Sequence, residues 1–170
     1  MNALTPAWAL SLAYWLHMLA TVTWIGGLAA ISLFVLPAAR RTLDAGAYAS
    51  FLQTIQKRLD PIAWLSLVIL IATGMLQMSA NPNYQGFLAI DNRWAAAILA
   101  KHLVILIMIG VSAYLTWGLI PRLQRLALRQ ARGLAGSDDG RLQKQEVLFL
   151  RLNLILGVVV LALTAVARAA

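Results

Sequence analysis

The chain alternates long apolar stretches with short polar segments. Each apolar stretch comes close to or exceeds the roughly 20 residues that a helix needs to cross the hydrocarbon core of a bilayer. The stretches are Ala7–Leu36, Pro61–Met78, Trp94–Ile120 and Val147–Ala167. Because backbone amides find no water to bond inside lipid, each stretch must be helical. The pattern predicts an all-α fold, an integral membrane four-helix bundle, with residues 1–170 forming a single transmembrane domain.

The polar connections carry further helical signals. Between the first two spans, apolar side chains recur at helical spacing opposite Lys57 and Arg58, which predicts an amphipathic helix on the inner membrane surface that leads into the second span. Its apolar members are Tyr48, Phe51, Leu52, Ile55 and Leu59. Residues 79–93 are predicted to form a turn-rich loop. Residues 122–132 are predicted to form a basic helical extension that contacts anionic lipid head groups. Residues 133–140 are predicted to form a flexible linker.

Composition supports a membrane protein and narrows its chemistry. The chain is 61% hydrophobic and 12% charged, outside the range of ordinary soluble proteins. It has no cysteine, which excludes disulfides, thiolate metal sites, iron–sulfur clusters and covalently attached haem. No Lys or Arg precedes Arg40, so a basic signal-peptide n-region is missing and the first span is expected to stay in the mature protein.

The net charge of +8 follows membrane topology rather than nucleic-acid binding. Only Arg93 and Arg168 flank the spans on one side of the predicted membrane. The two connections on the other side hold ten basic residues: Arg40, Arg41, Lys57, Arg58, Arg122, Arg125, Arg129, Arg132, Arg141 and Lys144. The positive-inside rule therefore predicts that both termini lie outside, in a multi-pass protein of the bacterial inner membrane.

Ionisable residues inside spans are costly and are therefore functional candidates. These are His17, Lys101, His102 and Arg151, of which Arg151 is expected to extend to the cytoplasmic interface. His17 lies nine residues after Trp8, and His102 lies eight residues after the tryptophan that opens the third stretch. At 1.5 Å per residue both histidines are roughly 12–14 Å deep. The two histidines of the chain are thus predicted to share one level of the bilayer.

Two imidazoles at one depth suit the axial positions of a b-type haem in a helical bundle. Trp24 shares a helical stripe with His17, while Gly27 and Gly74 would let a flat macrocycle approach the backbone. Arg93, Arg168 and Lys101 are candidates to neutralise the haem propionates. The alternative is that the histidines are interfacial side chains and that the glycines serve helix packing.

The neighbours Lys101 and His102 compete for the position opposite His17, because adjacent helical residues point about 100° apart. The stripe that contains Lys101 is slightly more polar. An amine ligand must first lose its proton, however, whereas imidazole is already largely neutral at pH 7. The proton cost favours bis-histidine ligation by His17 and His102, with Lys101 extending to the outer surface.

Copper is the competing cofactor. Three methionines, Met18, Met75 and Met78, are predicted to lie in the outer half near His17. Thioether with imidazole is a ligand set for copper(I), although Met also serves as ordinary filler in apolar packing.

The first span carries a motif that resembles a known family. The run from His17 through Trp24 to Gly27, followed by Pro37, is similar to the first helix of the copper-resistance D (CopD) domain family and of the related HemJ-type membrane proteins. The third span around Lys101 and the pair Thr73-Gly74 resemble their third and second helices.

The resemblance implies two activities. HemJ-type proteins are b-haem-containing protoporphyrinogen oxidases whose functional pair matches His17 and Lys101. CopD-type proteins are associated with copper uptake. This sequence lacks a Met/His-rich external segment, and it adds His102 to the pattern of both families.

These observations together predict a membrane b-type haem protein that acts in electron transfer or as a small oxidoreductase. The alternatives are a HemJ-like protoporphyrinogen oxidase, a CopD-like copper transport protein, and an accessory subunit of a respiratory or photosynthetic complex. The expected partners are the lipid bilayer, a quinone or protein electron partner, and a larger complex or a second copy of the chain.

Overall fold

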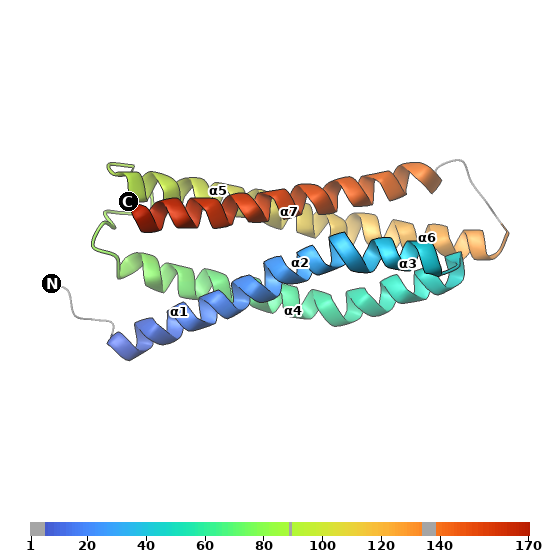
Figure 1. Ribbon diagram of the computed structural model, residues 1–170, viewed down its shortest axis with the longest axis horizontal. Helices are drawn as coiled ribbons and strands as arrows, with labels where there is room; N and C mark the ends of the chain where they lie inside the picture. Colours follow the sequence, from blue (N-terminus) through green and yellow to red (C-terminus); the bar gives the residue numbers. More distant parts are fainter. Residues whose placement is uncertain (1–5, 89, 134–138) are drawn as a thin grey trace.

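The computed structural model describes residues 6–88, 90–133 and 139–170, and its regular elements are helices. Consecutive helical segments join end to end into long helices, here called rods. Four rods are long and apolar enough to cross a membrane: Ala7–Thr42, Gly46–Ser79, Arg93–Arg129 and Lys144–Ala169. The predicted all-α, four-span fold is therefore confirmed, and the chain has the architecture of a multi-pass membrane protein (Figure 1).

The first rod is one continuous helix that changes its winding along its length. It comprises α1 (Ala7–Thr21), the π-helical η1 (Val22–Gly26), α2 (Gly27–Ala30), the π-helical η2 (Ile31–Val35) and α3 (Leu36–Thr42). It ends where Leu43 turns extended.

The second rod is α4 (Ala45–Ser79), which begins at an N-cap. Asp44 accepts a hydrogen bond from the backbone N–H of Ala47 at 2.8 Å. The helix then runs without interruption through Pro61.

The third rod comprises α5 (Arg93–Ala113), the π-helical η3 (Tyr114–Leu119) and α6 (Ile120–Ala131). Asn92 caps its start by accepting from Ala95 N–H at 2.7 Å. The fourth rod is α7 (Asp139–Ala169). The predicted linker 133–140 falls mostly outside the described residues.

Figure 1 shows the rods packed antiparallel, with α1 against α4 and α5 against α7. The start of α1, the end of α7 and the α4–α5 connection share one end of the bundle, here called the terminal end. The opposite end holds the end of α3, the start of α4 and α6, and is here called the basic end. The start of α1 and the end of α7 thus lie at the same end of the bundle.

Two clusters of buried side chains hold the two ends of the bundle. At the basic end they are Leu36, Ala39, Tyr48, Leu52, Leu115, Leu119 and Leu123. At the terminal end they are Met78, Trp94, Ala95, Ala97 and Ala167. Large apolar side chains such as Phe34 and Trp117 remain about 70% exposed, as lipid-facing positions do.

The segment predicted as a surface helix differs from expectation. Residues 48–59 belong to α4 itself, and Tyr48 and Leu52 are buried in the basic-end cluster against Leu119 and Leu123. The apolar face therefore packs on protein, because α3 and α6 extend far enough beyond the span to cover it.

Candidate functional site

His17 lies on α1 and contacts α4 through a hydrogen bond. Its Nδ1 is 2.8 Å from the hydroxyl oxygen of Thr73. That hydroxyl also lies 2.6 Å from the carbonyl oxygen of Ile69, one turn earlier on α4. A threonine has a single hydroxyl proton, and donation to Ile69 consumes it. The Thr73 oxygen must then accept from His17, which places the imidazole proton on Nδ1.

The consequence for His17 is that Nε2 carries a free lone pair. Metal-binding histidines commonly donate their other ring N–H to a neighbouring oxygen, which fixes the tautomer and the ring orientation. His17 has this arrangement before any ligand is considered.

Gly74 is what allows the ring to lie so close to α4. A Cβ at this position would come within 3.3 Å of His17 Cε1, tighter than ordinary van der Waals contact. The group that approaches Gly74 in the structure is the imidazole of His17, whereas the sequence predicts the approach of a macrocycle.

The two neighbours on α5 differ in what surrounds them. Lys101 is half-buried, and its ammonium lies close enough for its charge to act on His17. Arg168, near the end of α7, in turn acts on Lys101. His102 places its Nδ1 2.7 Å from the carbonyl oxygen of Ile98. Its ring also meets Phe87 edge-on, at 5.3 Å between centroids.

The hydrogen bond and ring contact of His102 are thus made to its own helix and to the α4–α5 connection. Lys101 is partly exposed, and its extension toward the outer surface remains a prediction. Bis-histidine ligation by His17 and His102 remains a prediction.

The other predicted site residues are dispersed. Arg168 lies over the ring of Tyr14 at 5.1 Å, and Arg93 is exposed at the start of α5. The methionines of the copper hypothesis do not gather either: Met18 and Met75 are more than half exposed, while Met78 is buried in the terminal-end cluster. Among the described residues no three His, Asp or Glu side chains are grouped to hold a metal ion.

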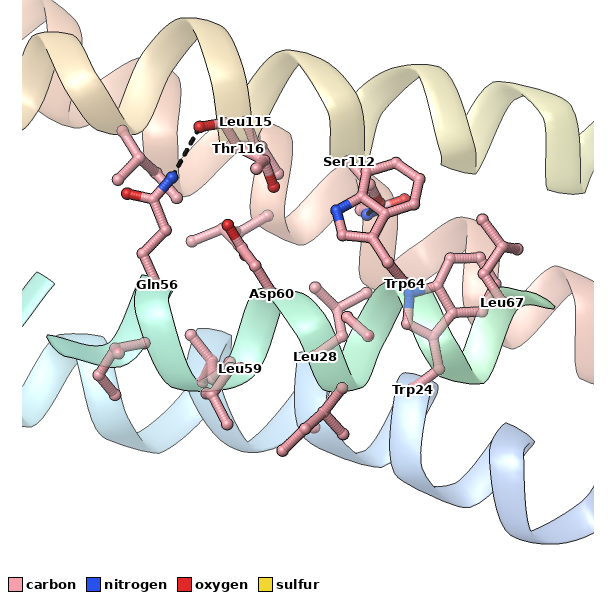
Figure 2. A pocket seen from close by; sticks show the side chains of 18 of the residues that line it. Trp24, Leu28, Gln56, Leu59, Asp60, Trp64, Leu67, Ser112, Leu115 and Thr116 are labelled. Atoms are coloured by element: carbon pink, nitrogen blue, oxygen red, sulfur yellow. Dashed lines mark hydrogen bonds between the residues drawn. The ribbon is translucent and has the colours of Figure 1, made fainter. Parts of the chain in front are cut away.

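A cavity of about 400 Å³ lies between the four rods, nearer the basic end than His17. Trp24 and Gly27, predicted to lie beside His17, line this cavity instead. Figure 2 shows Asp60 pointing from α4 toward the helix that carries Thr116, with the indole rings of Trp24 and Trp64 farther along the cavity.

The winding of the helices is irregular around this cavity. All three π-helical segments contribute to its wall, through Trp24 in η1, Ile31 in η2 and Thr116 in η3. One irregular carbonyl is bonded by a side chain, because Gln56 Nε2 donates to Thr116 O at 2.9 Å. Such single-turn π segments are frequent at functional sites.

At the basic end, three polar side chains form a closed cluster. The guanidinium of Arg40 on α3 pairs with Glu146 on α7, and its Nε donates to the hydroxyl of Tyr48 on α4 at 3.1 Å. Glu146 is only 1% exposed. The cluster joins three of the four rods.

Comparison with known proteins identifies the family. The sequence profile of the family described as Copper resistance protein D (CopD) matches residues 53–167, more than half of the chain. The chain belongs to the CopD family. Neither a curated protein nor a solved structure matches it.

The CopD match helps to place the site. It includes Thr73, Gly74 and Lys101 but begins after His17. The α1–α4 contact therefore brings His17, on which the resemblance chiefly rested, against residues of the matched region.

Several residues of these sites were not identified from the sequence. Thr73 stands out in the sequence only through the family resemblance, and Asp60 and Glu146 lie just outside the predicted spans. Asn153 interrupts an apolar run with a buried amide, which was the one available signal for the cavity.

Proposed function

We propose that this CopD-family protein is a membrane b-type haem protein in which His17 binds the iron, acting in electron transfer or as a small oxidoreductase. The observation that carries the proposal is the His17–Thr73–Ile69 hydrogen-bond chain, which leaves the Nε2 lone pair free inside an apolar bundle.

The donor set suits haem better than a bare ion. A porphyrin supplies four nitrogen ligands of its own, so one or two protein side chains complete the coordination. His17 is one, and Lys101 and His102 are the candidates for a second. Bound haem would supply one-electron transfer at this depth.

The surrounding residues have definable roles toward such a group. Thr73 holds the His17 tautomer, and Gly74 provides room for the ring. Lys101 on α5 and Arg168 near the end of α7 add positive charge to the half of the bundle that contains His17. This charge favours an anionic ligand such as one bearing propionates.

Copper is the second candidate, and the family match favours it, because CopD takes its description from copper resistance. An imidazole with a free Nε2 is also a copper ligand. A protein-only copper site needs further donors, and the exposed Met18 and Met75 would have to turn toward His17 to provide them.

The deciding experiment is metal analysis of the purified chain together with absorption spectra of the oxidised and reduced protein. We expect iron with a haem b spectrum, lost in His17→Ala. Trp15→Ala, an exposed change two residues away, serves as the control and should retain the full haem content. Stoichiometric copper without iron would establish the copper alternative, and full haem content in His17→Ala would refute the proposed ligand.

We further propose that the terminal end faces outward and the basic end faces the cytoplasm of a bacterial inner membrane. The asymmetry of ten basic residues against Arg93 and Arg168 supports this orientation. A reporter fused after Ala170 should be active only outside the membrane, and activity confined to the cytoplasm would reverse the assignment.

A further inference from the structure

The cavity between the rods contains a polar atom without a partner. Asn153 on α7 is 2% exposed and lines the cavity. Its Nδ2 donates to the hydroxyl of Ser112 at 2.8 Å, while its Oδ1 has no hydrogen-bond partner in the described structure. Burying an acceptor without a donor costs free energy, so such an atom indicates a missing ligand or water.

A second side-chain amide in the cavity, that of Gln56, differs from Asn153 in its hydrogen bonding. Gln56 also lines the cavity, but its Nε2 donates to Thr116 O and its Oε1 accepts from Gln124 at 3.0 Å. Both polar atoms of the Gln56 amide thus have a partner, whereas Oδ1 of Asn153 has none within the described residues. A ligand that complements this cavity must bring a hydrogen-bond donor to Asn153.

The walls define the rest of the ligand. Besides a few polar groups they are apolar, and the indole rings of Trp24 and Trp64 both contribute to them (Figure 2). Trp64 is itself held in place by stacking on Trp117, at 5.2 Å and 4° between planes. The volume of about 400 Å³ is within the range of small-molecule sites and admits an aromatic ring.

We propose that this cavity binds a lipid-soluble quinol, with one hydroxyl donating to Asn153 Oδ1 and the ring lying against Trp24 and Trp64. A neutral phenolic ring matches the apolar walls, its hydroxyl supplies the donor, and its lipid solubility matches a site within the membrane-crossing part of the bundle. His17 does not line the cavity, so this site goes beyond the proposed haem function and does not rest on it.

The test is calorimetric titration of the full purified chain with a decyl-substituted benzoquinol and with its dimethyl ether, which has the same ring and tail but no O–H. We expect saturable binding of one quinol and about tenfold weaker binding of the ether, the effect of losing one hydrogen bond to a buried acceptor. Equal affinity for the two compounds, or no saturable binding, would overturn the proposal and leave a bound water as the partner of Asn153.

Variants locate the site. Asn153→Leu should bind quinol and ether alike, whereas Gln53→Leu, an exposed amide on α4, should keep the preference for quinol. Trp24→Leu should weaken binding of both compounds, and Trp15→Leu, exposed on the same rod, should weaken neither. The tryptophan pair tests the proposal even if Asn153→Leu does not fold. Quinol affinity should be unchanged in His17→Ala, which separates this result from the outcome for haem.

Discussion

The polar side chains around Arg40 and those around His17 differ in how completely they are paired. At the basic end, Arg40 pairs with Glu146 and Tyr48, and both of its partners are buried. In the half nearer the terminal end, His17 is bonded through Nδ1 alone and keeps a free Nε2. A closed cluster stabilises helix packing, whereas an imidazole with one nitrogen left free is available to a ligand. The number of hydrogen-bonding atoms left without a partner, rather than the degree of burial, therefore distinguishes the structural site from the functional one.

The largest loss of stability is expected when one partner is removed from the closed cluster. Glu146→Ala leaves the Arg40 charge without its partner between three rods, and removing one member of a buried ion pair costs about 3–5 kcal/mol of stability. Thermal or chemical unfolding in detergent measures the loss.

The matched control is the double change Arg40→Met with Glu146→Leu, which removes both charges while keeping the volume and should recover most of that stability. Haem or copper content per folded molecule should stay at the wild-type level in both proteins. Loss of cofactor in a folded double variant would contradict a purely structural role for the cluster.

The site around His17, here called the open site because Nε2 is left free, should lose cofactor affinity rather than stability when it is changed. Thr73→Val removes the acceptor that holds the Nδ1 proton of His17 while keeping a similar shape. Changes to such supporting bonds cost about 10–100-fold in metal affinity. Thr164→Val is the control, because that hydroxyl bonds only the carbonyl of Val160 on its own helix. Equal affinities in the two variants would show that the Thr73 bond does not prepare His17.

The choice between Lys101 and His102 sharpens the comparison further. With His102 as the predicted second ligand, we expect His102→Ala to abolish a low-spin haem spectrum while Lys101→Met only shifts the redox potential. If Lys101 is the ligand instead, its amine must be neutral when bound, and the spectrum should change in Lys101→Met and survive in His102→Ala. Redox titration with optical detection distinguishes the two results.

The sequence predicted the helices because crossing a bilayer imposes length and apolarity on each of them. It could not predict rotations about the helix axes. Trp24 shares a stripe with His17, yet a stripe runs the full length of a helix, and seven residues separate the two by about 10 Å of depth. Trp24 therefore belongs to the cavity.

The same limit applies to pairs that are distant in the chain. Glu146 stands in a basic connection, a position that predicts solvent exposure, but it is buried and pairs with Arg40, which lies 106 residues away in the chain. Whether Lys101 or His102 faces His17 depends on a turn of about 100° that the pattern of apolar residues specified only weakly. The slightly more polar stripe favours the lysine, whereas the cost of removing a proton from its amine favours the histidine.

The smallest change in stability is expected when a glycine is replaced by alanine, and this change is also the most specific to the open site. Gly→Ala in a helix gains up to about 1 kcal/mol of intrinsic propensity. At Gly110 on α5 a Cβ meets nothing within 4 Å, so Gly110→Ala should stabilise the protein by a few tenths to about 1 kcal/mol. At Gly74 the same methyl group lies 3.3 Å from His17 Cε1, and the ring is held by Thr73. The imidazole must shift by a few tenths of an ångström, which offsets the gain in propensity and misaligns Nε2. Gly74→Ala should therefore leave the midpoint of thermal unfolding near the wild-type value while lowering cofactor affinity, whereas Gly110→Ala raises the midpoint and leaves affinity unchanged. If both variants gain stability and keep their cofactor, the contact between Gly74 and His17 does not position the ring, and the distinction between the open and closed sites would rest on hydrogen bonding alone.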